Sequence, residues 1–115
     1  TRSIGIGVCD DPFAEIAMEL TAGAAELLET DVRVTREDVH IHYCIGPGYA
    51  IPSPEGCAAV RRLARAEGVL ADPVYTGKAL AGFFQLLEQG AFDGDEDILF
   101  VHTGGAGALF AVDMV

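Results

Sequence analysis

Basic residues are scarce in this sequence of 115 residues. Eighteen aspartate and glutamate residues face seven lysine and arginine residues, which gives a formal net charge of −11. A chain this acidic repels phosphate backbones and anionic membranes, which argues against nucleic acids and membrane surfaces as partners. Lys78 is the single lysine, and therefore the one ammonium available for a Schiff base. Its place in the first turns of a predicted helix favours a solvated surface residue.

Long apolar runs and paired cysteine motifs are also missing. No run of about 18 apolar residues occurs, so no membrane-spanning helix is expected. Cys9, Cys44 and Cys57 form no CxxC motif and lie in apolar segments, which predicts buried free thiols in a reducing cytoplasm. The chain starts without an initiator Met or a targeting segment, as if inside a strand. We therefore expect residues 1–115 to be a single partial domain of a longer protein.

Predicted strands and helices alternate along the chain. Short apolar segments rich in β-forming residues predict buried strands near 4–9, 39–45 and 98–102. Apolar residues at helical spacing predict three amphipathic helices, which begin near 13, 54 and 76 and end near 29, 68 and 90. Half of the residues are apolar, enough for a packed core. The alternation indicates an α/β fold with an open, mainly parallel sheet covered on both faces, in three layers.

The helix ends carry local signals. Asp10–Pro12 predicts an acidic N-cap with proline in the first turn of the first helix. Ser53 followed by Pro54 predicts the N-cap of the second helix, and Gly68 predicts its C-terminal cap.

Chemistry in an open α/β sheet is expected at the carboxyl ends of the strands. Three loops leave such ends, at residues 10–11, 46–52 and 103–107. The last is rich in glycine, and its bare amides suit an anion or a flat ring, although a plain tight turn explains the pattern equally well. Tyr49 and Tyr75 lie beside chain breakers, where a phenol can move a proton or orient a carboxylate. By composition alone, two boundary residues with wet hydroxyls are the simpler interpretation.

His40, His42 and Cys44 alternate along one predicted strand and so share a face. These residue types suit zinc, but no fourth ligand stands at a recognised spacing. We therefore expect half-buried histidines and no metal site.

Three motifs together are specific. They are Gly46-Pro47-Gly48-Tyr49-Ala50-Ile51-Pro52, Asp72-Pro73-Val74-Tyr75-Thr76-Gly77-Lys78-Ala79 and His102-Thr103-Gly104-Gly105-Ala106. In this order and spacing the chain resembles the D-cysteine desulfhydrase and 1-aminocyclopropane-1-carboxylate (ACC) deaminase family of pyridoxal-phosphate (PLP) enzymes of fold type II. The resemblance spans residues 46–111, with 4–11 as a preceding strand, and implies the C-terminal part of such an enzyme.

The resemblance implies a role for each site residue. Tyr49 and Tyr75 correspond to the family's catalytic tyrosines that flank the substrate, and Thr76 to the residue that faces the pyridine nitrogen of PLP. Thr103 corresponds to a residue that lines the cofactor pocket, with Gly104 and Gly105 allowing close backbone approach. A small amino acid is the implied substrate, and a homo-oligomer is the implied assembly.

The sequence also departs from the family pattern. Ala50 replaces a glycine of the tyrosine loop, and Gly107 stands where the family often has proline. The upstream segments that carry the Schiff-base lysine, a serine and the phosphate cup have no counterpart here, and Lys78 matches a different, helical lysine of the family. We therefore expect the missing N-terminal portion of the enzyme to be a partner, and the chain alone to be inactive.

Thr76 and Thr103 favour the desulfhydrase branch, since deaminases of the family typically have glutamate and leucine there. A carboxylate at the ring nitrogen favours its protonated form and a stronger electron sink. A threonine hydroxyl leaves that nitrogen mostly neutral, which suits α,β-elimination of D-cysteine to pyruvate, sulfide and ammonia. The alternatives are an ACC deaminase-like fragment, a non-catalytic α/β binding or assembly module, and an unrelated small α/β domain.

Overall fold

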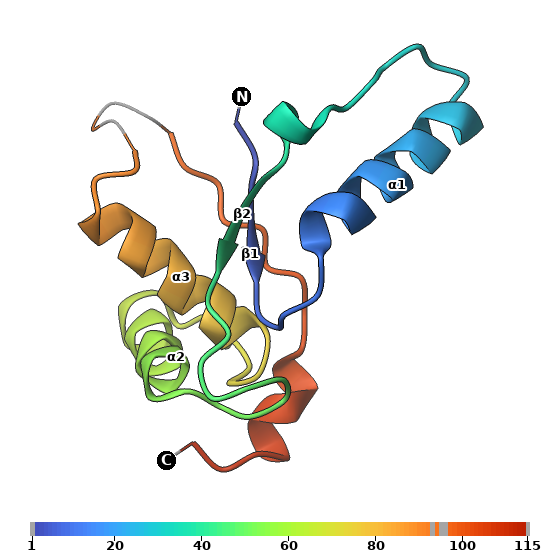
Figure 1. Cartoon of the computed structure of the whole chain (residues 1–115). Coiled ribbons are helices and arrows are strands. Elements are labelled where there is room, and N and C mark those ends of the chain that lie inside the picture. The colour runs from blue at the N-terminus through green and yellow to red at the C-terminus, as the bar shows by residue number, and fades with distance from the viewer. Residues whose placement is uncertain (1, 93, 95–96, 115) are drawn as a thin grey trace.

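The computed structural model describes residues 2–92, 94 and 97–114. Strands β1 (Ile4–Gly7) and β2 (His40–Tyr43) form a parallel pair in which Ile4 lies opposite His40 and Gly7 opposite Tyr43. Helix α1 (Phe13–Leu27) covers one face of this sheet and α3 (Thr76–Glu88) the other, and α2 (Pro54–Glu67) packs against α3 (Figure 1). The parallel sheet between helical layers confirms the predicted fold class.

Close contact between α3 and the sheet depends on Gly82. A Cβ added there would lie 2.8 Å from the side chain of Ile6 and 3.1 Å from the Cβ of Cys44. The ring of His42 faces the same glycine, and its Nε2 lies 3.3 Å from the side-chain oxygen of Gln85 in α3. His42 and Cys44 therefore share a face, as their alternation predicts, and that face is packed against a helix.

The ends of α2 are as the sequence predicts. The Ser53 hydroxyl accepts a hydrogen bond from the Gly56 amide at 3.0 Å, and Gly68 adopts a left-handed φ of 67°. The predicted acidic cap of α1 is wrong. Pro12 itself occupies the N-cap position, no side chain caps the helix, and the Phe13 amide donates to the Asp11 carbonyl. The Asp11 carboxylate instead accepts the thiol hydrogen of Cys9 at 3.1 Å.

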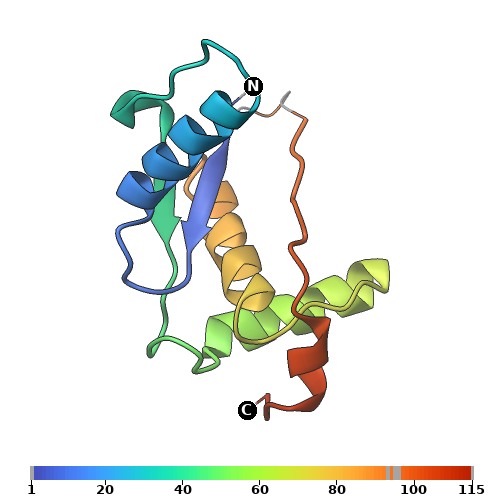
Figure 2. The same cartoon turned by 90° about the vertical axis from the view of Figure 1, so that its right-hand side faces the viewer.

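The predicted third strand at 98–102 is wrong for the part of the chain that the structure describes. This segment is extended and runs in the same direction as the two strands, on the β1 side of the sheet, but the ladder contains β1 and β2 alone (Figure 2). Phe100 packs into the core, whereas Leu99 is 86% exposed and Val101 is 69% exposed. The segment has strand-forming residues and lacks an adjacent strand.

The core is small and lies between α2 and α3. Ala59, Leu80 and Ala81 form its buried centre, and the partly buried residues around it include Phe83 and Phe100. The apolar side chains of α1 beyond its first turns are uncovered, as Leu20 shows with 68% of its surface exposed. The accessible surface of 7886 Å² is roughly a third more than the ~6,000 Å² of a compact protein of this size. The radius of gyration, 15.5 Å, likewise exceeds the about 13 Å of a compact domain.

All three cysteines are free thiols. The predicted burial is confirmed for Cys9 and Cys57, whereas Cys44 is only partly buried. Within the described ranges, no helix combines the length and the apolar character needed to cross a bilayer.

Candidate active site

Tyr49 and Tyr75 meet although they lie 26 residues apart in the sequence. Their hydroxyl oxygens are 2.9 Å apart, a hydrogen-bonding distance, and their rings pack edge to face with centroids 6.1 Å apart. Both side chains reach solvent, with 60% of Tyr49 and 41% of Tyr75 exposed. Two phenols on one open surface can contact the same small molecule.

The loop that carries Tyr49 has an unusual backbone. Gly46 has a φ of 65°, and a Cβ there would lie 2.7 Å from the Cβ of Ser53, so the loop folds tightly onto the start of α2. Ala50 also adopts a left-handed φ, 59°. This conformation costs a residue with a side chain about 1–2 kcal/mol relative to glycine. Glycine adopts this conformation without that strain, which is a physical reason for the glycine at this position in the resembling family's pattern.

The Asp72 carboxylate organises the turn before α3. It is fully buried and accepts hydrogen bonds from the amides of Val74, Tyr75 and Thr76 at 2.7–2.8 Å. It also accepts the Thr76 hydroxyl at 2.6 Å. Burial acts to raise the pKa of Asp72, but the hydrogen bonds from Thr76, Tyr75 and Val74 outweigh burial and lower the pKa. Asp72 is therefore an ionised cap that fixes the backbone of Tyr75.

Thr76 is almost fully buried, with 2% of its surface exposed. Its hydroxyl donates to Asp72 Oδ1 and accepts from the Asp72 amide at 2.9 Å. A hydroxyl has one hydrogen and two lone pairs, so Thr76 retains one acceptor position in this arrangement. The Asp72 carboxylate, with four donors, is already saturated.

Gly105 packs directly over the Asp72 turn. A Cβ at this position would lie 2.5 Å from Asp72 Oδ1, and the φ of 87° also favours glycine. Gly104 has a φ of 109° with open space around its α-carbon, and Thr103 is exposed. The structure thus brings the paired glycines to the turn that carries Tyr75 and Thr76.

His102 holds the glycine loop. Its Nδ1 accepts from the Gly104 amide at 3.2 Å, so Nε2 carries the hydrogen and donates to the Leu70 carbonyl at 3.0 Å. Reasoning from sequence assigned no role to His102 or Asp72. The local signal was an aspartate in a turn, because aspartate side chains often accept a hydrogen bond from the amide two residues on, as Asp72 does from Val74.

The prediction made for Lys78 is also wrong. The sequence favoured a solvated surface lysine, but Lys78 is fully buried, and its Nζ donates to the Gly48 carbonyl at 2.6 Å. Burial lowers the pKa of this ammonium. The reason for the error is tertiary, since the tyrosine loop folds over the first turn of α3.

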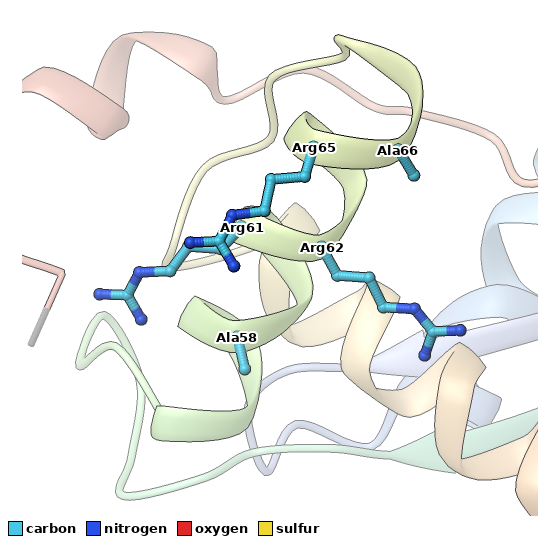
Figure 3. Close-up of a pocket in the computed structure, with 5 residues that line it drawn as sticks. All are labelled: Ala58, Arg61, Arg62, Arg65 and Ala66. Carbon is cyan, nitrogen blue, oxygen red and sulfur yellow. The ribbon is translucent and has the colours of Figure 1, made fainter.

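An open surface pocket of about 490 Å³ lies elsewhere, along α2 (Figure 3). Arg61, Arg62 and Arg65 line it with two alanines. Arg62 stacks its guanidinium on the Phe84 ring at 4.2 Å, and Arg61 donates to the Met114 carbonyl at 2.8 Å. None of these side chains belongs to the tyrosine loop, the Asp72 turn or the glycine loop.

Comparison with protein families matches residues 7–104 to the pyridoxal-phosphate dependent enzymes. The chain belongs to this family. A solved structure of an ACC deaminase homologue superimposes on 90% of the chain with a TM-score of 0.76 and 34% sequence identity. The match covers 31% of that protein's own length. The resemblance to the desulfhydrase and deaminase family that the motifs indicated is confirmed.

Proposed function

We propose that this chain forms the substrate side of the active site of a PLP-dependent lyase that eliminates sulfide from D-cysteine. The observation that carries the proposal is the hydrogen-bonded pair of Tyr49 and Tyr75 at the Asp72–Thr76 turn, against which Gly105 packs. A phenol pair, a buried cap and a glycine loop come together from three separate segments. Such convergence is typical of a site for a small polar molecule.

The hydroxyls of Thr76 and Thr103 and the bare backbone of Gly104 and Gly105 are groups that suit PLP. When bound, PLP supplies the electron sink that stabilises negative charge at the substrate α-carbon. Thr76 would lie beside the ring nitrogen, and its hydroxyl hydrogen, now donated to Asp72 Oδ1, would turn toward that nitrogen to share a hydrogen bond with it. Thr103 with the open backbone of Gly104 and Gly105 would line the cofactor. A neutral hydroxyl stabilises a protonated ring nitrogen less than a carboxylate does, and the carboxylate that is bonded to Thr76, that of Asp72, is saturated by internal donors. This arrangement supports elimination of a good leaving group over opening of a carbon ring.

The tyrosine pair suits a donor role. The hydrogen bond and the charge of Tyr49 raise the pKa of Tyr75 above its ordinary value of 10.0. Tyr75 is therefore protonated at neutral pH, and the pair presents an O–H group toward solvent. Such a group can bind the carboxylate of an amino acid and hold the α-carbon in place.

The chain requires a further polypeptide segment for this function. Its one lysine, Lys78, is buried and bonded to Gly48, so the lysine that binds PLP covalently is expected to come from outside these residues. The uncovered stripe of α1 and the unpaired segment 98–102 supply apolar surface for such a segment. A homo-oligomer stays a prediction.

Ring-opening deamination of ACC is the second candidate, favoured by the similarity to the ACC deaminase homologue. The test is to express the sequence together with the lysine-bearing portion, as one chain or two, and to load it with PLP. D-cysteine and ACC are then supplied separately, and sulfide, ammonia and 2-oxo acid are measured. We expect sulfide from D-cysteine, and none above the free-PLP background from the 115-residue chain alone. Ammonia from ACC without sulfide would establish the second candidate, and no product from either substrate would favour a non-catalytic module.

A further inference from the structure

Lys78 connects the two segments that carry the tyrosines. It lies in the first turn of α3, three residues after Tyr75, and its side chain reaches the carbonyl of Gly48, the residue before Tyr49. The two partners are 30 residues apart in the sequence. The side chain also runs beneath the loop, since a Cβ on Gly46 would lie 3.7 Å from Lys78 Cε.

Burying an ammonium is costly unless its hydrogens find acceptors. Lys78 is fully buried, and desolvation lowers its pKa, while the thiols of Cys44 and Cys9 are the ionisable groups that counteract this. An apolar side chain of similar length would fill the same space without this cost. The bond to Gly48 therefore explains why a lysine occupies this buried position, because an apolar side chain cannot donate that hydrogen bond.

We propose that Lys78 is a positioning residue whose ammonium holds the Gly48 carbonyl and thereby places the Tyr49 phenol against Tyr75. That the tyrosine pair binds substrate rests on the proposed function. The geometry of the pair is independent of that function. The tyrosine hydroxyls meet in an exposed position, where water competes for both. Within the loop, Gly48 has one further backbone contact, a long 3.4 Å bond from the Ile51 amide. The bond from the buried Lys78 is shorter than this one, at 2.6 Å, and it joins the loop to α3.

The test measures the phenol pair directly, with Lys78→Met as the variant. Methionine keeps the length and apolar stem and removes the donor. The protein is labelled with ¹³Cζ-tyrosine, and the pKa of Tyr75 is read by NMR with and without Tyr49→Phe in each background. We expect Tyr49→Phe to lower the pKa of Tyr75 in the wild-type background and to leave it unchanged in the Lys78→Met background. Phe83→Leu is the matched control, because it weakens the packing of α3 farther along the helix, in the cluster with Phe92 and Phe100. The effect of Tyr49→Phe should survive in that control.

An equal effect of Tyr49→Phe in the wild-type and Lys78→Met backgrounds would overturn the proposal, since the pair would then form without the lysine. Equal loss of the effect in Phe83→Leu would overturn it too, because any weakening of α3 would suffice. If Lys78→Met does not fold, an ester in place of the Gly48–Tyr49 amide weakens the Gly48 carbonyl as an acceptor and keeps every side chain. The same two outcomes apply to it. Absence of lyase activity would count against the proposed function and leave these readings intact.

Discussion

The α-carbon of Gly105 lies so close to the Asp72 carboxylate that a Cβ on Gly105 would be 2.5 Å from Oδ1. The contact joins the C-terminal glycine loop to the cap of α3, and it places the last of the three motifs beside the second. It depends on a missing side chain on one partner and on a buried charge on the other. Both halves of the contact can be tested separately.

Gly105→Ala should lower the free energy of unfolding by about 2 kcal/mol or more, because it combines a left-handed backbone with a steric clash. Gly107→Ala is the matched control in the same loop. A Cβ on Gly107 meets nothing within 4 Å, so a change of about 0.5 kcal/mol or less is expected. Urea unfolding measures both variants, and similar stabilities for the two would contradict the observed packing.

Asp72→Asn should lower the free energy of unfolding at neutral pH by about 3 kcal/mol, because hydrogen bonds to a charged group contribute about 1.5–3 kcal/mol each and the amide turns one acceptor into a donor. The folded-state pKa of Asp72 is lowered. Its stabilisation is therefore fully present above the ordinary carboxyl pKa of about 3.9 and is lost as the pH falls through the folded value. The difference between wild type and variant should shrink below that pH. A difference independent of pH would show that Asp72 is not the ionised cap.

Tyr75→Phe in the PLP-loaded enzyme should raise KM for the amino-acid substrate by about ten- to a hundredfold, the equivalent of a hydrogen bond of about 1.5–3 kcal/mol to a charged carboxylate. Tyr43→Phe is the control, since the Tyr43 hydroxyl bonds to the Asp11 carbonyl and not to either tyrosine of the pair. Steady-state kinetics with both variants decide the matter. Unchanged KM in Tyr75→Phe would remove this tyrosine from the substrate site.

Thr76→Val should lower the free energy of unfolding by about 1–3 kcal/mol even without PLP, because it leaves the Asp72 amide without its buried acceptor. Thr103→Val, on an exposed residue, should change it by about 0.5 kcal/mol or less. In the loaded enzyme, Thr76→Glu should reduce sulfide release and increase transamination, since a carboxylate stabilises the protonated ring nitrogen. The partition is measured as sulfide against pyridoxamine phosphate. No change in rate or partition would show that Thr76 does not face the ring nitrogen.

The sequence by itself determined the features whose signals are local. Ser53 and Gly68 bound α2 because a cap depends on the residue itself and the next turn of backbone. Alternating and helical patterns placed β1, β2 and the three helices, and the spacing of three motifs indicated the family. Ala50 adopts a left-handed backbone in this turn without being a glycine, at the cost of strain.

Tertiary structure alone decided the state of Lys78, of the 98–102 segment and of the α1 stripe. The position of Lys78 in its helix does not predict burial. It is buried because a loop 30 residues earlier in the sequence folds over α3. Residues 98–102 have the composition of a strand, but a strand forms only where a neighbour supplies donors and acceptors. The later part of the α1 stripe is apolar in sequence and exposed in space, because burial needs two surfaces and the sheet covers only the start of the helix, around Phe13, in the described part of the chain.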